Sequence, residues 1–145
     1  MRQVNHDELV YMLYDGMRAW RASTRKEIAH EPRSGSDPSR KIAADALVQR
    51  LFNCEFYPEP GGARLADNRV TDIIAGLIGG LRPSLRRDFV SPLQDVQKQA
   101  RRTAALLLAE GLEHFWILRD SPPTGFPFPD IAGGIVEPLK YHEGD

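Results

Sequence analysis

The sequence predicts an all-α protein: a compact domain of four helices, with a long central helix near its C-terminal end and an extended tail rich in Pro and Phe. Apolar residues recur at helical spacing in four segments. Pro and Gly concentrate between those segments and again after residue 119. We therefore divide the chain into a helical domain, residues 1–119, and a tail, residues 120–145, packed on the domain or on a partner.

The first expected helix begins near Asn5 or Asp7, either of which can cap it, and ends in the stretch 25–30. The side chains of its apolar face are Leu9, Leu13, Met17 and Trp20. The sequence "HEPRSGSDPSR" that follows predicts a loop, because Pro32 and Gly35 interrupt any helical period.

The next two helices are expected from Pro38 to about Asn53 and over "NRVTDIIAGLIGGL". Pro38 is typical of a first helical residue, and Arg82–Pro83 stops the third helix. Between them, "CEFYPEPGG" leaves room for at most one short strand.

The fourth helix is expected from Leu93 to about Arg119. Its first half is amphipathic, with Leu93, Val96, Ala100 and Ala104 directed inward. Its second half, "LLLAEGLEHFWIL", is apolar nearly all round, which is typical of a buried central helix and would place His114 in the core.

The tail carries five prolines and four glycines in "SPPTGFPFPDIAGGIVEPLKYHEGD", so it cannot be helical. It is nevertheless too apolar for a disordered linker. Phe126 and Phe128 lie on a stiff extended backbone, which is the geometry of a peptide that docks into a groove. With Ile131 they are candidate protein-interaction residues, docked either on the chain's own helices or on a partner.

Composition narrows the class of protein. The 19 basic and 20 acidic residues give a net charge of −1, so no global field attracts nucleic acid or anionic lipid. The single Cys54 excludes a disulfide framework and cysteine-rich zinc modules. No secretory signal is recognisable, and the most apolar run, 103–118, is too short to span a bilayer. We expect a soluble cytoplasmic protein without membrane contact, metal or cofactor.

Arg25 and His30 form an Arg-x4-His motif. It resembles the active-site signature of the HEPN superfamily, all-helical domains many of which are metal-independent ribonucleases. The resemblance implies that Arg25 and His30 stabilise a phosphate and assist proton transfer from an attacking 2′-hydroxyl. The residues themselves favour a helix C-terminus, where Arg25, Lys26 and His30 complement the negative end of the dipole.

Gly76 and Gly79 have the spacing of the loop with which KH domains clamp a nucleic-acid backbone, but the residues between them are the apolar Leu77 and Ile78. Together with Gly80 they favour a flat helix surface for close packing, either against the long fourth helix or against a second copy of the chain. We treat all three glycines as candidate protein-interaction residues.

A group of six cations is expected around the start of the fourth helix: Arg82, Arg86, Arg87, Lys98, Arg101 and Arg102. Such a patch would give weak, salt-sensitive binding to nucleic-acid phosphates. No aromatic residue interleaves with it, which argues against a base-stacking platform. The competing interpretation is a solvated basic face paired with Asp88, Asp95 or a protein partner.

The sequence thus favours a non-enzymatic subunit or adaptor of a larger assembly, acting through contacts with a protein partner or with copies of itself. A nucleic-acid-binding subunit, acting alone or within a ribonucleoprotein, is the alternative. A HEPN-like ribonuclease is the third hypothesis.

Overall fold

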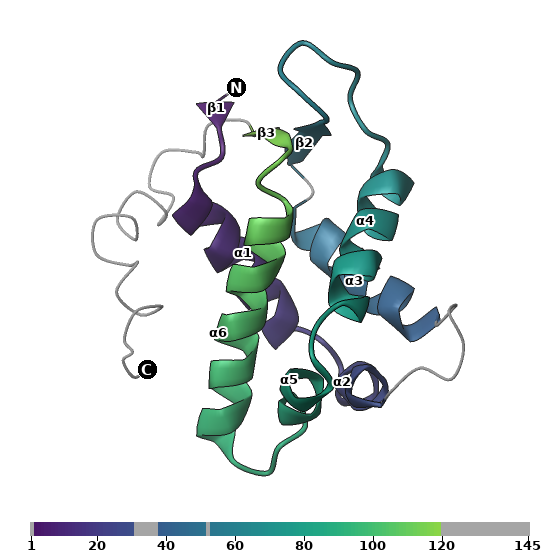
Figure 1. Cartoon of the computed structure of the whole chain (residues 1–145), viewed down its shortest axis with the longest axis vertical. Helices are drawn as coiled ribbons and strands as arrows, with labels where there is room; N and C mark the ends of the chain where they lie inside the picture. The colour runs from purple at the N-terminus through teal and green to yellow at the C-terminus, as the bar shows by residue number, and fades with distance from the viewer. Residues whose placement is uncertain (1, 31–37, 52, 120–145) are drawn as a thin grey trace.

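The computed structural model describes residues 2–30, 38–51 and 53–119, and it is mostly helical (Figure 1). The elements in chain order are β1 Arg2–Gln3, α1 His6–Arg18, α2 Ala22–Ala29, α3 Pro38–Arg50, β2 Cys54–Tyr57, α4 Asp67–Gly79, α5 Pro83–Asp88, α6 Gln94–Gly111 and β3 Trp116–Arg119. The helical class is confirmed. The tail, with Phe126, Phe128 and Ile131, lies outside the described residues.

Three short strands form an antiparallel sheet at one end of the molecule, in the order β1-β3-β2 (Figure 1). The all-α prediction is therefore wrong in this part of the chain. The fourth helix was expected to continue to about Arg119, but α6 ends at Gly111 and residues 116–119 are the central strand. Because β-branched and aromatic residues suit a pleated, half-buried surface, "WILR" becomes a strand once two neighbours pair with it.

Two breaks raise the number of helices in the described part of the chain from four to six. The first expected helix stops at Arg18, and a separate α2 begins at Ala22. After α4, Pro83 is the first residue of the short helix α5 rather than part of a loop. The strand expected within "CEFYPEPGG" is confirmed as β2.

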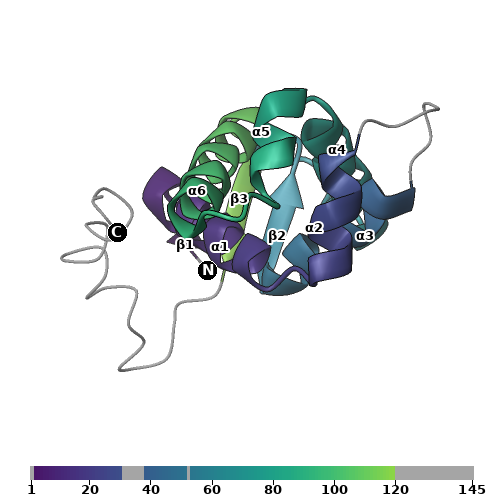
Figure 2. The ribbon, with the colours of Figure 1, turned by 90° about the horizontal axis from the view of Figure 1, so that it is seen from below.

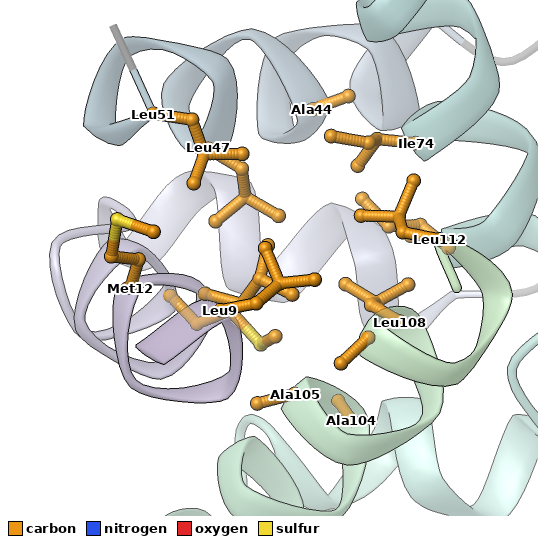
Figure 3. Packing of buried hydrophobic residues seen from close by; sticks show 14 of the residues in the cluster. Leu9, Met12, Ala44, Leu47, Leu51, Ile74, Ala104, Ala105, Leu108 and Leu112 are labelled. Atoms are coloured by element: carbon orange, nitrogen blue, oxygen red, sulfur yellow. The ribbon is translucent and has the colours of Figure 1, made fainter. Parts of the chain in front are cut away.

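The core lies where α1, α3, α4 and α6 meet, and Figure 3 shows their side chains converging. Leu47 packs against Gly16 so closely that a side chain at Gly16 would displace it. At the other end of the molecule the Trp20 and Phe89 rings meet edge to face, with centroids 5.6 Å apart. The Trp20 indole donates to the Ala43 carbonyl over 3.1 Å, so one side chain joins the end of α1 to α3.

A buried ion cluster holds the sheet on α1. The Glu8 carboxylate accepts from Arg119 over 3.0 Å and, with both oxygens, from Arg2 over 2.8 and 2.7 Å. Arg119 is 4% exposed and Glu8 is 7% exposed. Burying charges costs several kcal/mol per ion unless they are paired and hydrogen-bonded, so the three side chains stabilise the fold only as a unit.

Burial by itself would raise the pKa of Glu8. The hydrogen bonds from Arg2 and the charges of Arg2 and Arg119 outweigh that effect and lower it below its ordinary value of 4.5. Burial also raises the pKa of the neighbouring Cys54 thiol, to about 11. The carboxylate is therefore stabilised in its charged form, and the thiol in its neutral form.

Replacing Glu8 by Gln should lower the free energy of unfolding by about 3–5 kcal/mol, because it leaves the buried Arg119 without its counter-charge. Since the folded state lowers the pKa of Glu8, the ion cluster stabilises the parent fully above pH 4.5 and less as the pH falls below it. Urea melts at several pH values measure both effects. Glu59→Gln, at an exposed glutamate, is the control and should stay within about 0.5 kcal/mol of the parent. An unchanged acid profile in Glu8→Gln would show that Glu8 does not carry this dependence.

Cys54 should resist alkylation in the native protein. With a pKa of about 11 and a buried sulfur, the thiol is almost entirely protonated at pH 8 and shielded from reagent. We expect labelling by iodoacetamide to be at least about a hundredfold slower in buffer than in denaturant, measured by mass spectrometry. Equal rates would contradict the burial of β2 against β3.

Candidate functional site

Arg25 and His30 lie on and just after α2. The Arg25 guanidinium donates to the Trp20 carbonyl over 2.7 Å and so satisfies a backbone acceptor just beyond α1. His30 is the exposed C-cap residue, where the backbone turns extended. The helix end expected at this motif is confirmed, and the ribonuclease role of the pair stays a prediction.

The six expected cations do not share one surface. Arg86 is only 5% exposed, and its Nε has no hydrogen-bond partner among the described residues. Arg101 lies over the Tyr14 ring of α1, with its guanidinium carbon 5.8 Å from the ring centroid. Arg86 is thus buried away from the surface, and Arg101 contacts α1.

Arg82 lies elsewhere, in an open cavity of about 560 Å³ between α5 and α6. Asp88 and Asp95 line the same cavity, so the positive charge of Arg82 lies near two carboxylates. Positions 101 and 102 of α6 face away from this cavity, because the cavity wall of α6 is formed by residues 95, 96, 99, 100 and 103. Arg87 and Lys98 are exposed, and Arg102 is half-buried.

The glycines of α4 differ in what surrounds them. Gly76 is exposed, and a side-chain carbon there would meet nothing within 4 Å. At Gly79 the same carbon would collide with the guanidinium of Arg40 from α3. Gly79 thus lies close to a side chain of α3 and not, as expected, to the long fourth helix, while Gly76 and Gly80 lie on the surface.

Ala100 and Ala104 of α6 are buried as the sequence predicted, but other apolar residues on the flank of α6 beside α5 are exposed. Leu93 was expected to face inward but is 63% exposed, and Leu107 is 40% exposed. Five residues at alternating spacings of three and four form a line along this flank, which we call the α6 stripe: Leu93 (the N-cap residue), Val96, Ala100, Thr103 and Leu107. Val96 and Thr103 are half-buried, and Ala100, in the middle of the line, is 3% exposed and belongs to the core. The sequence signal was present in this spacing, but it cannot distinguish a face that meets the core from one that meets solvent.

The neighbouring Leu106 is 43% exposed but lies about 100° round the helix from Leu107, outside the stripe. Figure 2 shows α6 end-on with α5 beside it. Val96, Ala100 and Thr103 of the stripe form one wall of the cavity of about 560 Å³, and Leu85 of α5 lies on the opposite wall. The stripe is thus the edge of a hollow between two helices.

A second cavity of about 490 Å³ lies between α2 and α3. Its polar lining is partly occupied by contacts within the fold: Asp45 accepts from Thr71 over 3.0 Å, and the Trp20 indole donates to Ala43. Ile42, 58% exposed, stands on its wall. This cavity contains none of the candidate catalytic, nucleic-acid-binding or protein-interaction residues that the sequence predicted.

His114, expected in the core, is exposed, because it follows the end of α6 at Gly111 and precedes β3. Among the described residues, no group of three or more His, Cys, Asp or Glu side chains is placed to hold a metal ion. In the same part of the chain, no helix combines the length and the apolar character needed to cross a membrane.

No protein-family model, no curated protein and no solved structure matches the chain significantly.

The two glycines give a matched pair of variants. Gly76→Ala should raise the free energy of unfolding by about 1 kcal/mol, because the position is an exposed helix interior with open space around it. Gly79→Ala should gain nothing, because the new methyl group displaces Arg40. Thermal and urea melts of both variants test this difference. An equal gain in both would show that Arg40 does not rest on α4.

Proposed function

We propose that this chain is a non-enzymatic subunit of a larger protein assembly, and that it contacts its partner through the α6 stripe. The observation that carries the proposal is the exposure of Leu93 and Leu107 at the two ends of one helix face. Exposed apolar residues that stand singly need no explanation, but two of them joined by half-buried residues along the edge of a hollow are typical of an interaction surface.

The spacing of the stripe supports a helical partner. Leu93, Val96, Thr103 and Leu107, at i, i+3, i+10 and i+14, occupy a and d positions of a heptad repeat, the pattern with which one helix packs against another. The a position between them, Ala100, is already packed in the chain's own core. The hollow lined by Leu85 and Ala100 offers space for side chains of the partner. A helix laid in a groove is a recurring mode of protein recognition.

The charges favour protein over nucleic acid as the ligand of this face. Arg82 is the one cation in the cavity, and the carboxylates of Asp88 and Asp95 stand beside it. A polyanion laid there would meet two like charges for one opposite charge. Nucleic-acid binding by exposed cations such as Arg87 and Lys98 remains a separate hypothesis.

The test is capture from native lysate with the tagged full-length chain, with and without nuclease. We expect a stoichiometric protein that survives nuclease and is lost when Leu93 and Leu107 are both replaced by Ser. Leu106→Ser is the matched control, because it removes an equally exposed leucine from the same helix outside the stripe. Circular dichroism melts establish that both variants are folded.

Retention of the protein by the Leu93→Ser/Leu107→Ser variant, or its equal loss in Leu106→Ser, would contradict the proposed surface. Loss of all partners on nuclease treatment, with nucleic acid in the eluate, would favour the nucleic-acid hypothesis instead. Arg87→Ala with Lys98→Ala would then be the variants to compare.

A further inference from the structure

The small sheet has an apolar outer face. Burial alternates along β2 and β3, so that every second side chain is buried on the core side and the others are half-buried on the opposite side. On the outer side β3 carries Trp116 and Leu118, and β2 carries Glu55 and Tyr57. The three apolar side chains are not among those that pack on the core. We call this surface the sheet face: Tyr57, Trp116 and Leu118.

The two aromatic residues of the sheet face are neighbours, and one of them is restrained. Tyr57 and Trp116 are directly opposite each other in the register of β2 with β3, which places their side chains side by side. The Tyr57 hydroxyl donates to the Glu55 carboxylate over 2.6 Å, and an Arg64 guanidinium nitrogen lies 3.7 Å from the other oxygen of that carboxylate. Rigid Tyr and Trp side chains offer a large contact area and lose little conformational entropy on binding.

The edges of the sheet leave little room for a further strand. The outer edge of β2 is already occupied, because the Leu65 N–H donates to the Phe56 carbonyl over 2.8 Å. On the opposite edge, β1 is only two residues long. A segment that covers Trp116 therefore lies across the sheet face rather than extending the sheet.

The tail continues directly from β3, and its composition matches the sheet face. Phe126 and Phe128 are two positions apart, so on an extended chain their side chains point to the same side, about 7 Å from each other. Trp116 and Leu118 have the same spacing along β3. Each Phe is followed by a proline, which restricts the backbone to extended conformations. Aromatic-lined surfaces bind proline-rich peptides in such conformations.

Length and charge favour docking of the tail on its own domain. The seven residues from Arg119 to Phe126 span up to about 23 Å, whereas Trp116 lies only about 10 Å back along β3. Gly125 favours the reversal of direction that this requires. The tail has five acidic residues and one basic residue, a net charge of −4. Because the whole chain carries −1, residues 1–119 carry +3 and attract the tail.

We infer that residues 121–129 of the tail fold back and dock in cis on the sheet face, with the Phe126 and Phe128 side chains against Trp116 and Tyr57. The sheet face is separate from the α6 stripe, so this inference does not depend on the proposed function. It assigns the docking expected of the tail to the chain's own sheet rather than to its helices or to a partner.

The first experiment is acrylamide quenching of tryptophan fluorescence in the full-length chain. The other tryptophan, Trp20, is 4% exposed, so the quenching reports mainly on Trp116. Phe126→Ser with Phe128→Ser should raise the quenching constant at least about twofold and shift the emission to longer wavelength, because the large indole surface is uncovered. Ile135→Ser with Val136→Ser makes the same kind of change elsewhere in the tail, and this control should behave like the parent.

The second experiment detects the contact itself. In NMR spectra of the full-length chain, nuclear Overhauser effects should connect the indole protons of Trp116 with ring protons of Phe126 or Phe128. The quenching constant of the parent should also stay the same on dilution from about 50 to 1 μM, because a contact in cis does not depend on concentration.

An unchanged quenching constant in the Phe126→Ser/Phe128→Ser variant overturns the inference, as does an equal rise in the Ile135→Ser/Val136→Ser control. Protection of Trp116 that is lost on dilution overturns it in favour of docking in trans. Overhauser effects that connect Phe126 and Phe128 with residues of the helices, and not with Trp116, place the segment elsewhere on the domain and overturn it as well.

Discussion

The fold depends on one buried carboxylate. Glu8, in the first turn of α1, lies between Arg119 at the end of β3 and Arg2 in β1, and so ties together segments 111 residues apart in the sequence. β3 is the central strand and pairs with both β1 and β2, so the sheet cannot form without it. Because α6 leads directly into β3, the same contact holds the C-terminal end of α6 against α1. One side of α6 therefore packs in the core, and the opposite side faces solvent.

Several charged residues make contacts within the fold, whereas two leucines of the α6 stripe do not. Glu8 and Arg119 are buried in an ion cluster, Arg101 covers an aromatic ring, and Arg25 satisfies a carbonyl beyond α1. Charged side chains that are already paired cannot also bind a ligand without losing those contacts. Leu93 and Leu107 have the opposite status, because they are apolar and lie in water. A partner that covers the α6 stripe would therefore remove both leucines from water.

Helical periodicity predicted the cores of α1, α3, α4 and α6 well, because Leu13, Leu47, Ile74 and Leu108 recur on faces that pack together. Periodicity did not predict the elements that form only by pairing with segments distant in the sequence. Residues 116–119 are a strand only because β1 and β2 lie on either side of them, and no local pattern records that. Sequence spacing also grouped Arg86 and Arg101 with the surface cations. In the structure Arg86 is buried, and the long side chain of Arg101 reaches the Tyr14 ring, which spacing alone does not predict. Exposure of Leu93 could not be foreseen, since an apolar a/d line serves a core and an interface equally.

Hydroxyl-radical footprinting tests the central claim, that the α6 stripe is the contact surface, most directly. The side chains of the full-length chain are oxidised alone at low concentration and again in its captured assembly, and each leucine is quantified by mass spectrometry. The claim predicts that Leu93 and Leu107 are protected in the assembly while Leu106, equally exposed on the same helix, and Ile42 on α3 are oxidised as before. Unchanged oxidation of Leu93 and Leu107, with protection elsewhere on the molecule, would contradict it.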